Sequence, residues 1–126
     1  MAVSPAIPKM SDVDLYTKSL NELLELRNDF ARSKWKTRLA TADAATRLEF
    51  SRLRAKIQEL IRTLTNARLA EIAGELRKNE TGLKEGIAKC QGAREHFETV
   101  ERALKAFTAF VVVVGRIAKV AADVIV

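Results

Sequence analysis

Few residues in this sequence have the chemistry of a catalytic centre. The chain contains one cysteine, Cys90, and one histidine, His96. At 100° per residue these two positions lie about 120° apart on a helix, so a thiol–imidazole pair within one chain is not expected. A single cysteine and a single histidine also fall short of a transition-metal ligand set. We therefore expect no enzyme, no metal site and no cofactor.

Basic residues concentrate in one stretch of the chain. The net charge is +6, and residues 32–56 hold eight basic residues against Asp43 and Glu49, which accounts for the whole excess. Within this stretch, four cations flank Trp35: Arg32, Lys34, Lys36 and Arg38. This basic patch could stack on a nucleic-acid base or lie at a lipid headgroup boundary; alternatively it is a solvated helix end with Trp35 packed against a neighbour. No zinc-finger spacing, glycine-rich phosphate loop or recognition-helix motif accompanies it.

The composition predicts a single all-α domain. The chain has 126 residues, of which 48% are hydrophobic and 30% charged, a balance typical of folded proteins. Pro5 and Pro8 are the only prolines, so the long remainder contains no obligatory helix breaker. One cysteine excludes an intrachain disulfide and fits a reducing compartment. The first ten residues lack the pattern of a secretory signal, which favours the cytoplasm or a larger assembly such as a virion and leaves membrane association open.

The apolar periodicity predicts three long helices after a disordered tail of residues 1–10. These helices span residues 11–38, 43–78 and 83–126. Thr41 or Asp43 could cap the second helix, and residues 79–82 form the clearest break in the chain. The second helix has a coiled-coil-like seam with an imperfection near Arg68, and its length would be about 54 Å. We therefore expect an extended hairpin or bundle of two or three long helices, coiled-coil-like and oligomeric.

Residues 106–126 form the most apolar stretch and reach the length of a membrane span, about 20 residues. The positions expected to mediate assembly or membrane insertion are Phe107, Phe110, Val111, Val114, Ile117, Val120, Val124 and Ile125. A polar stripe runs along the same helix through Lys105, Thr108, Arg116, Lys119 and Asp123. It continues the polar face of the preceding residues, so one helical phase is expected over residues 91–123. The three charges disfavour a lone membrane span, because each costs about 2.5 to 3.5 kcal/mol near the centre of a bilayer.

Three interpretations of this apolar stretch are open. It could be a core helix of a soluble oligomer or bundle, or it could enter a membrane as an assembly that turns the polar stripe inward. A β-strand is the third alternative, because residues 111–114 are four consecutive valines.

Small residues recur on one face of residues 82–93. Gly82, Gly86, Cys90 and Ala93 follow each other at steps of three or four. They could allow two helix backbones to approach closely at the base of a hairpin. The other interpretation is a flexible turn around the two glycines, with Cys90 as an ordinary small buried residue.

The expected helices are too long for a compact monomer of this size, and the uncovered end would be the apolar one. Self-association or a partner would cover it. The leading hypothesis is a non-enzymatic interaction protein that forms a homo-oligomer, or docks in a larger protein assembly, through its C-terminal helix. One alternative is a membrane-inserting or pore-forming protein that uses residues 106–126. A second alternative is a nucleic-acid-binding protein that uses residues 32–56.

Overall fold

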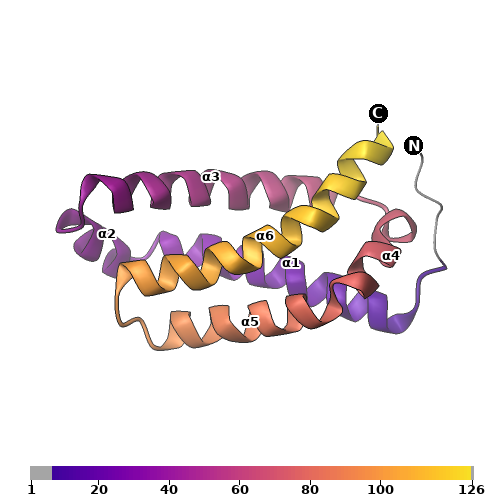
Figure 1. Ribbon diagram of the computed structural model, residues 1–126, viewed down its shortest axis with the longest axis horizontal. Coiled ribbons are helices and arrows are strands. Elements are labelled where there is room, and N and C mark those ends of the chain that lie inside the picture. The colour runs from indigo at the N-terminus through magenta and orange to yellow at the C-terminus, as the bar shows by residue number, and fades with distance from the viewer. Residues whose placement is uncertain (1–6, 126) are drawn as a thin grey trace.

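Six helices and no strand make up the part of the chain that the computed structural model describes, residues 7–125 for the backbone and 7–122 for the side chains (Figure 1). The helices are α1 (Met10–Phe30), α2 (Ser33–Ala40), α3 (Ala44–Thr65), α4 (Leu69–Lys78), α5 (Glu80–Glu95) and α6 (Val100–Ile125). The prediction of an all-α fold is confirmed, and the valine run lies in α6 rather than in a strand. Residues 1–6 of the expected tail lie outside the described residues, and Met10 already belongs to α1.

The four longer helices, α1, α3, α5 and α6, form a bundle in which α1 and α5 run in one direction and α3 and α6 in the other (Figure 1). Each of them packs against two others, in the closed order α1, α3, α6, α5. The short helix α2 lies at one end of the bundle beside α6, and α4 packs against α6 and α1 at the other end. The core therefore lies between four helix faces.

The prediction of two or three long helices in a hairpin or coiled coil is wrong. Each expected helix is divided in two, at residues 31–32, 66–68 and 96–99. The second break coincides with the imperfection expected near Arg68, which is the N-cap of α4. Because the chain folds back at these points, apolar faces that would overhang in long helices meet in one core. The single helical phase expected over residues 91–123 is lost for the same reason.

The first break brings Trp35 into the core. Its side chain is fully buried, and its indole ring contacts Phe30 edge-on, with 4.8 Å between the ring centroids. Phe50, Phe97 and Phe107 complete the aromatic cluster around it, at centroid distances from the indole of 5.5, 4.6 and 6.0 Å. A continuous helix would carry Trp35 past this cluster, so the burial of one large aromatic side chain stabilises the turn.

Polar side chains fix the starts of three helices. The Asp43 carboxylate accepts a hydrogen bond of 2.8 Å from the backbone N–H of Thr46. Of the two expected N-cap residues, Asp43 therefore caps α3. The Thr99 hydroxyl accepts from the backbone N–H of Arg102 at 3.1 Å and so caps α6. In α1, the carboxylate of Asp12 accepts from the backbone N–H of Lys9, at 2.8 Å.

Helices α5 and α6 form a closely packed hairpin. A Cβ atom on Gly86 would lie 2.9 Å from Cδ1 of Phe110 and 3.2 Å from its Cβ. One turn earlier, a Cβ on Gly82 would lie 3.5 Å from Val113, and one turn later the Cys90 thiol lies 3.8 Å from the Ala106 carbonyl oxygen. The small residues therefore face α6 within a regular helix, which supports the close-approach interpretation over a flexible turn.

Three buried carboxylates on α1 bind cations from three other helices. Asp12 receives two hydrogen bonds from Arg77 of α4, at 3.1 and 2.7 Å. Glu22 receives two from Arg94 of α5, both at 2.8 Å. The Asp29 carboxylate contacts the ammonium of Lys34 in α2 at 3.0 Å and accepts a hydrogen bond of 2.8 Å from the indole N–H of Trp35. All three acids are at most 3% exposed. A buried carboxylate without such partners is strongly unfavourable, so these pairs fix the position of α1 against its neighbours.

Candidate functional site

The apolar positions expected on the last helix are largely covered by the chain itself. Phe107, Phe110, Val111, Val114 and Ile117 are all buried, packed among α3, α4 and α5. Val120 is half-buried, and the side chains of Val124 and Ile125 lie outside the described residues. The inner face of α6 is therefore part of the monomer core. Within the described residues, no helix is long and apolar enough to cross a membrane.

The polar stripe of α6 lies on its outer face. Lys105, Arg116 and Lys119 are exposed, Thr108 is half-buried, and the side chain of Asp123 lies outside the described residues. One apolar residue, Val112, falls in the same sector of the helix and is 53% exposed. The outer face of α6 thus offers cations around one apolar side chain.

A groove of about 700 Å³ runs between α3 and α6 beside this stripe. Its apolar surface comes from Leu48 and Leu53 of α3 and from Val111 and Val112 of α6. Leu48 is 51% exposed, so the two most exposed of these side chains come from different helices. A volume of this size is within the range of ligand-binding clefts.

Small residues leave the space that the groove occupies. Ala45, Thr108 and Gly115 line it between the larger apolar side chains. A Cβ atom on Gly115 would meet no other heavy atom within 4 Å, which means that the helix surface there is open. The groove is therefore a consequence of side-chain size on two well-packed helices.

Positive charge dominates the edge of the groove. Arg52 and Lys56 line the α3 side together with Glu49. Lys56 lies 3.6 Å from Glu59, but both side chains are well exposed, so this ion pair holds Lys56 only weakly. Arg52 makes no ion pair with any described residue. An occupant of the groove would meet apolar side chains flanked by cations.

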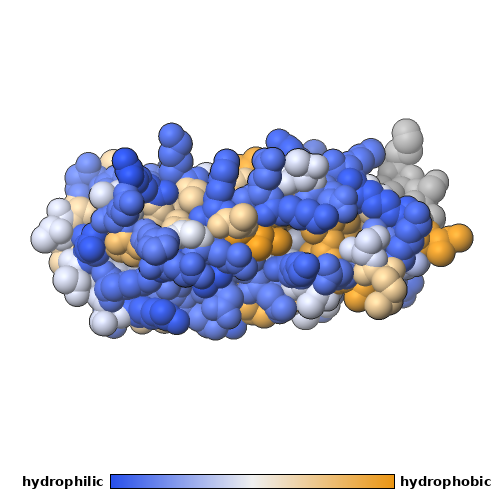
Figure 2. Space-filling view, turned by 90° about the horizontal axis from the view of Figure 1, so that it is seen from below, coloured by the Kyte–Doolittle hydropathy of each residue, from blue (hydrophilic) through white to orange (hydrophobic). Residues whose placement is uncertain are grey.

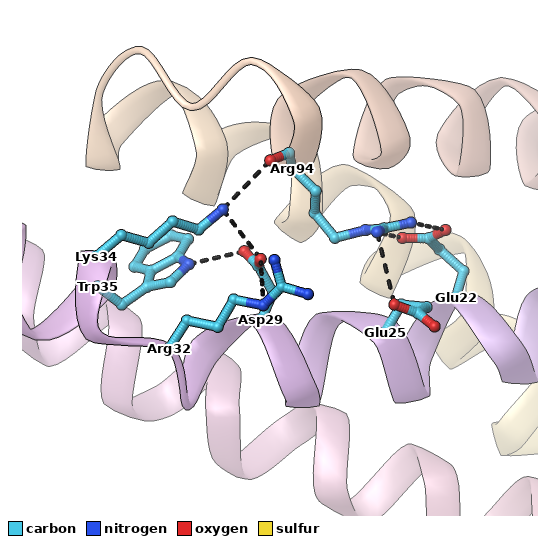
Figure 3. A network of polar contacts seen from close by, with 7 residues as sticks. All are labelled: Glu22, Glu25, Asp29, Arg32, Lys34, Trp35 and Arg94. Atoms are coloured by element: carbon cyan, nitrogen blue, oxygen red, sulfur yellow. Dashed lines mark hydrogen bonds and ion pairs between the residues drawn. The ribbon is translucent and has the colours of Figure 1, made fainter.

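The basic patch expected around Trp35 is mostly engaged within the fold (Figure 3). The indole N–H of Trp35 donates to the Asp29 carboxylate, and the Lys34 ammonium contacts the same carboxylate and the backbone carbonyl of Arg94, at 3.2 Å. Arg38 donates to the backbone carbonyl of Glu98 at 2.7 Å. The cations of Lys34 and Arg38 also lie 5.1 Å from the centre of the Phe97 ring.

These contacts tie α2 to the loop between α5 and α6. The two remaining members of the expected patch, Arg32 and Lys36, have exposed side chains. Arg32 lies near the Asp29 carboxylate at 3.9 Å. Trp35 is thus unavailable to a base or a lipid, whereas Lys36 remains open to a ligand.

The lone cysteine and histidine are far from a catalytic arrangement. Cys90 is fully buried, and burial raises the pKa of its thiol well above the usual range. His96 is exposed at the C-cap of α5. No group of three or more histidine, cysteine, aspartate or glutamate side chains that could hold a metal ion occurs among the described residues.

The face of the bundle on the α5 side is mostly hydrophilic. Seen from below the view of Figure 1, it carries small apolar areas separated by polar side chains (Figure 2). A smaller hollow of about 380 Å³ between α1 and α5 exposes part of the Arg94 ion pairs, with Glu22 at 2.8 Å and Glu25 at 3.7 Å. Burial raises the pKa of Glu22 and Arg94 opposes that rise, so this cluster has a structural explanation.

The groove was not predicted from the sequence, although two apolar residues in unusual helical positions indicate it. Leu48 lies about 160° around α3 from the buried seam, and Val112 lies among the polar residues of α6. Apolar residues outside the apolar phase of their helices are candidates for contact with a partner.

Comparison of the chain with protein-family models, with curated proteins and with solved structures found no match.

Proposed function

We propose that this protein is a non-enzymatic interaction module that binds an acidic amphipathic helix of a partner protein in the groove between α3 and α6. The observation that carries the proposal is the position of Leu48 and Val112. Of the large hydrophobic side chains that are exposed among the described residues, three lie in the N-terminal segment, at Ile7, Met10 and Val13, and the other two line this groove. Exposed apolar residues gathered at one concave site are typical of binding surfaces.

A helix fits the geometry of this site. The groove lies between two long helices that run in the same direction from the α2 end of the bundle (Figure 1). A third helix can lay its side-chain ridge between them at an interaxial distance of about 8–10 Å. Its anchors would be apolar residues at steps of three and four, as in other helix-in-groove complexes.

The charge of the groove favours an acidic partner over a second copy of the same chain. A symmetric dimer through this surface would bring Arg52 and Lys56 near their own copies, and each chain carries a net charge of +6. Like charges in an interface are unfavourable and select against that pairing. Glutamates along the rim of a partner helix would instead pair with Arg52 and Lys56.

A synthetic helix tests the proposal directly. The probe is a fluorescein-labelled peptide of about 20 residues, long enough to hold a helix, with leucine on one face and glutamate on the other. Its twin carries lysine in place of glutamate. Fluorescence anisotropy should detect binding of the acidic peptide and none of the basic twin, because only the first complements Arg52 and Lys56.

Matched variants locate the binding. The double substitution Leu48→Ala and Val112→Ala removes the two exposed anchors of the groove. Each anchor is about half exposed, so its burial by a ligand contributes about 1 kcal/mol, and the pair should weaken binding by at least tenfold. The control, Met10→Ala with Val13→Ala, removes exposed apolar side chains elsewhere and should change affinity less than twofold.

Three results would contradict the proposal. Equal losses in the two double variants would mean that the peptide binds elsewhere. A concentration-dependent dimer in light scattering that disappears in the groove variant would assign the surface to self-association. Binding to phosphatidylcholine–phosphatidylserine vesicles that the groove variant abolishes would assign it to lipid.

A further inference from the structure

A second concave surface, independent of the groove, lies where α1, α2 and α3 meet. Its volume is about 320 Å³ and its charged lining consists of Arg27 from α1, Lys36 from α2 and Arg54 from α3. Gln58 of α3 adds an amide, and no carboxylate lines the hollow. Three helices thus direct donors of one sign of charge to a single place.

The break between α1 and α2 creates this convergence. Because α1 ends at Phe30 and α2 starts at Ser33, the chain turns and brings Lys36 beside Arg27 and α3. None of Arg27, Lys36 and Arg54 makes an ion pair with a described residue. This differs from Lys34, which is held by a buried carboxylate of the fold.

A row of donors extends the hollow along the outer side of α3. At 100° per residue, five exposed polar residues between positions 47 and 62 share a sector of about 80°. They are Arg47, Ser51, Arg54, Gln58 and Arg62. The two glutamates of α3, Glu49 and Glu59, point to other sectors of the helix. From the first arginine of the row to the last, the helix rises about 22 Å, which corresponds to about six nucleotide steps of 3.4 Å.

We propose that this basic face, formed by the hollow and the arginine row of α3, binds the phosphodiester backbone of a nucleic acid. The row is too long for one phosphate group, so its ligand must be a polyanion. Guanidinium groups present parallel N–H donors that match phosphate oxygens, and the hollow places two of them and an ammonium around one phosphate. Flanking phosphates would contact Arg62 and the N–H groups of Arg47 other than the one that donates to the Ala42 carbonyl.

The chemistry of the hollow favours this ligand over an acidic protein. Its only large apolar residue, Phe30, is 6% exposed, so it offers almost no apolar surface to a partner side chain. Protein interfaces generally need such an apolar centre, whereas contacts to a nucleic-acid backbone do not. Because Trp35 is buried in the core, no aromatic side chain of α2 stacks on a base, and the binding is to the backbone without sequence preference.

Two triple variants with the same change in charge test the proposal. The first replaces Arg27, Lys36 and Arg54 by glutamine. The control replaces Lys89, Lys105 and Arg116, which are exposed on α5 and α6, by glutamine. Both lower the net charge from +6 to +3, since each removes three cations. Binding of a labelled duplex DNA of random sequence is measured by anisotropy at several salt concentrations, and circular dichroism checks that each variant is folded.

The first variant should weaken DNA binding at least tenfold, and the control less than threefold. In the first variant the slope of log K against log salt should also become shallower by about 2 to 3, because three fewer counterions are released. Pyrophosphate should displace the DNA only at millimolar concentration. Equal losses in both variants, displacement by polyglutamate at the same charge concentration, or pyrophosphate binding as tight as that of DNA would each overturn the proposal.

Discussion

The close packing of α5 on α6 makes a sharp prediction for Gly86→Ala. In a helix interior this substitution alone stabilises a protein by about 1 kcal/mol, because alanine loses less backbone entropy on folding. At Gly86, however, the new Cβ would lie 2.9 and 3.2 Å from atoms of Phe110 and 3.4 Å from its Cα. The Phe110 ring is fully buried, so it cannot swing into solvent, and the two helices must separate by a few tenths of an ångström.

The expected magnitude follows from these two opposing effects. Overpacking of this kind costs about 1–3 kcal/mol, which cancels or exceeds the gain in helix propensity. Gly92→Ala is the matched control, because Gly92 lies in the same helix and its added Cβ would meet nothing within 4 Å. The control should keep the gain, so the two variants should differ by about 1–3 kcal/mol in the free energy of unfolding.

Thermal unfolding followed by circular dichroism can resolve this difference. For 126 residues the unfolding entropy corresponds to about 4 °C in Tm per kcal/mol, so Gly86→Ala should melt about 4 to 11 °C below Gly92→Ala. Urea denaturation gives the same comparison as a free energy. If both variants were stabilised equally, the hairpin could not be packed as closely as described, and the reasoning would be refuted.

Three further predictions concern buried polar groups. Cys90 should react with iodoacetamide at pH 8 far more slowly in the native protein than in urea, because burial raises the thiol pKa; equal rates would place the thiol at the surface. Arg77 lowers the pKa of Asp12, so this carboxylate stabilises the fold above about pH 4 and loses that effect as the pH falls further; Asp12→Asn should flatten the decline of unfolding free energy in acid, and an unchanged pH profile would contradict the ion pair. Trp35→Phe keeps an aromatic ring but removes a donor to Asp29, and urea denaturation should show a loss of about 1–3 kcal/mol, whereas no loss would exclude that hydrogen bond.

The fold class followed from composition and periodicity, but the helix breaks did not. The divisions at residues 31–32, 66–68 and 96–99 contain no glycine or proline, so the usual local signals are absent. The break at residues 31–32 depends on the burial of Trp35 beside Phe30. These two residues are close in sequence, but they pack against aromatic side chains from distant helices. Such breaks are stabilised by tertiary contacts that a one-dimensional pattern does not contain.

The candidate sites were predictable only in part. The excess of basic residues in the second quarter of the chain pointed to a charged surface. It did not indicate which of these cations stay free of contacts within the fold. Lys34 and Arg38 bond within the fold, whereas Arg27, outside that stretch, joins Lys36 and Arg54 in the hollow. For the last helix, five of the eight apolar residues named from the sequence lie in the core: Phe107, Phe110, Val111, Val114 and Ile117. Val112, which was not named, is exposed in the groove.

The carboxylates of α1 also bear on how the chain matures during synthesis. The ribosome makes Glu22 long before Arg94, and Asp12 long before Arg77, so the first helix leaves the exit tunnel while both counter-ions are still to be made. Until they arrive, these acids are better left in water than packed, because an unpaired buried charge is costly. The first helices can associate only loosely before the hairpin of α5 and α6 is complete, and the bundle closes as a unit once the last third of the chain has emerged.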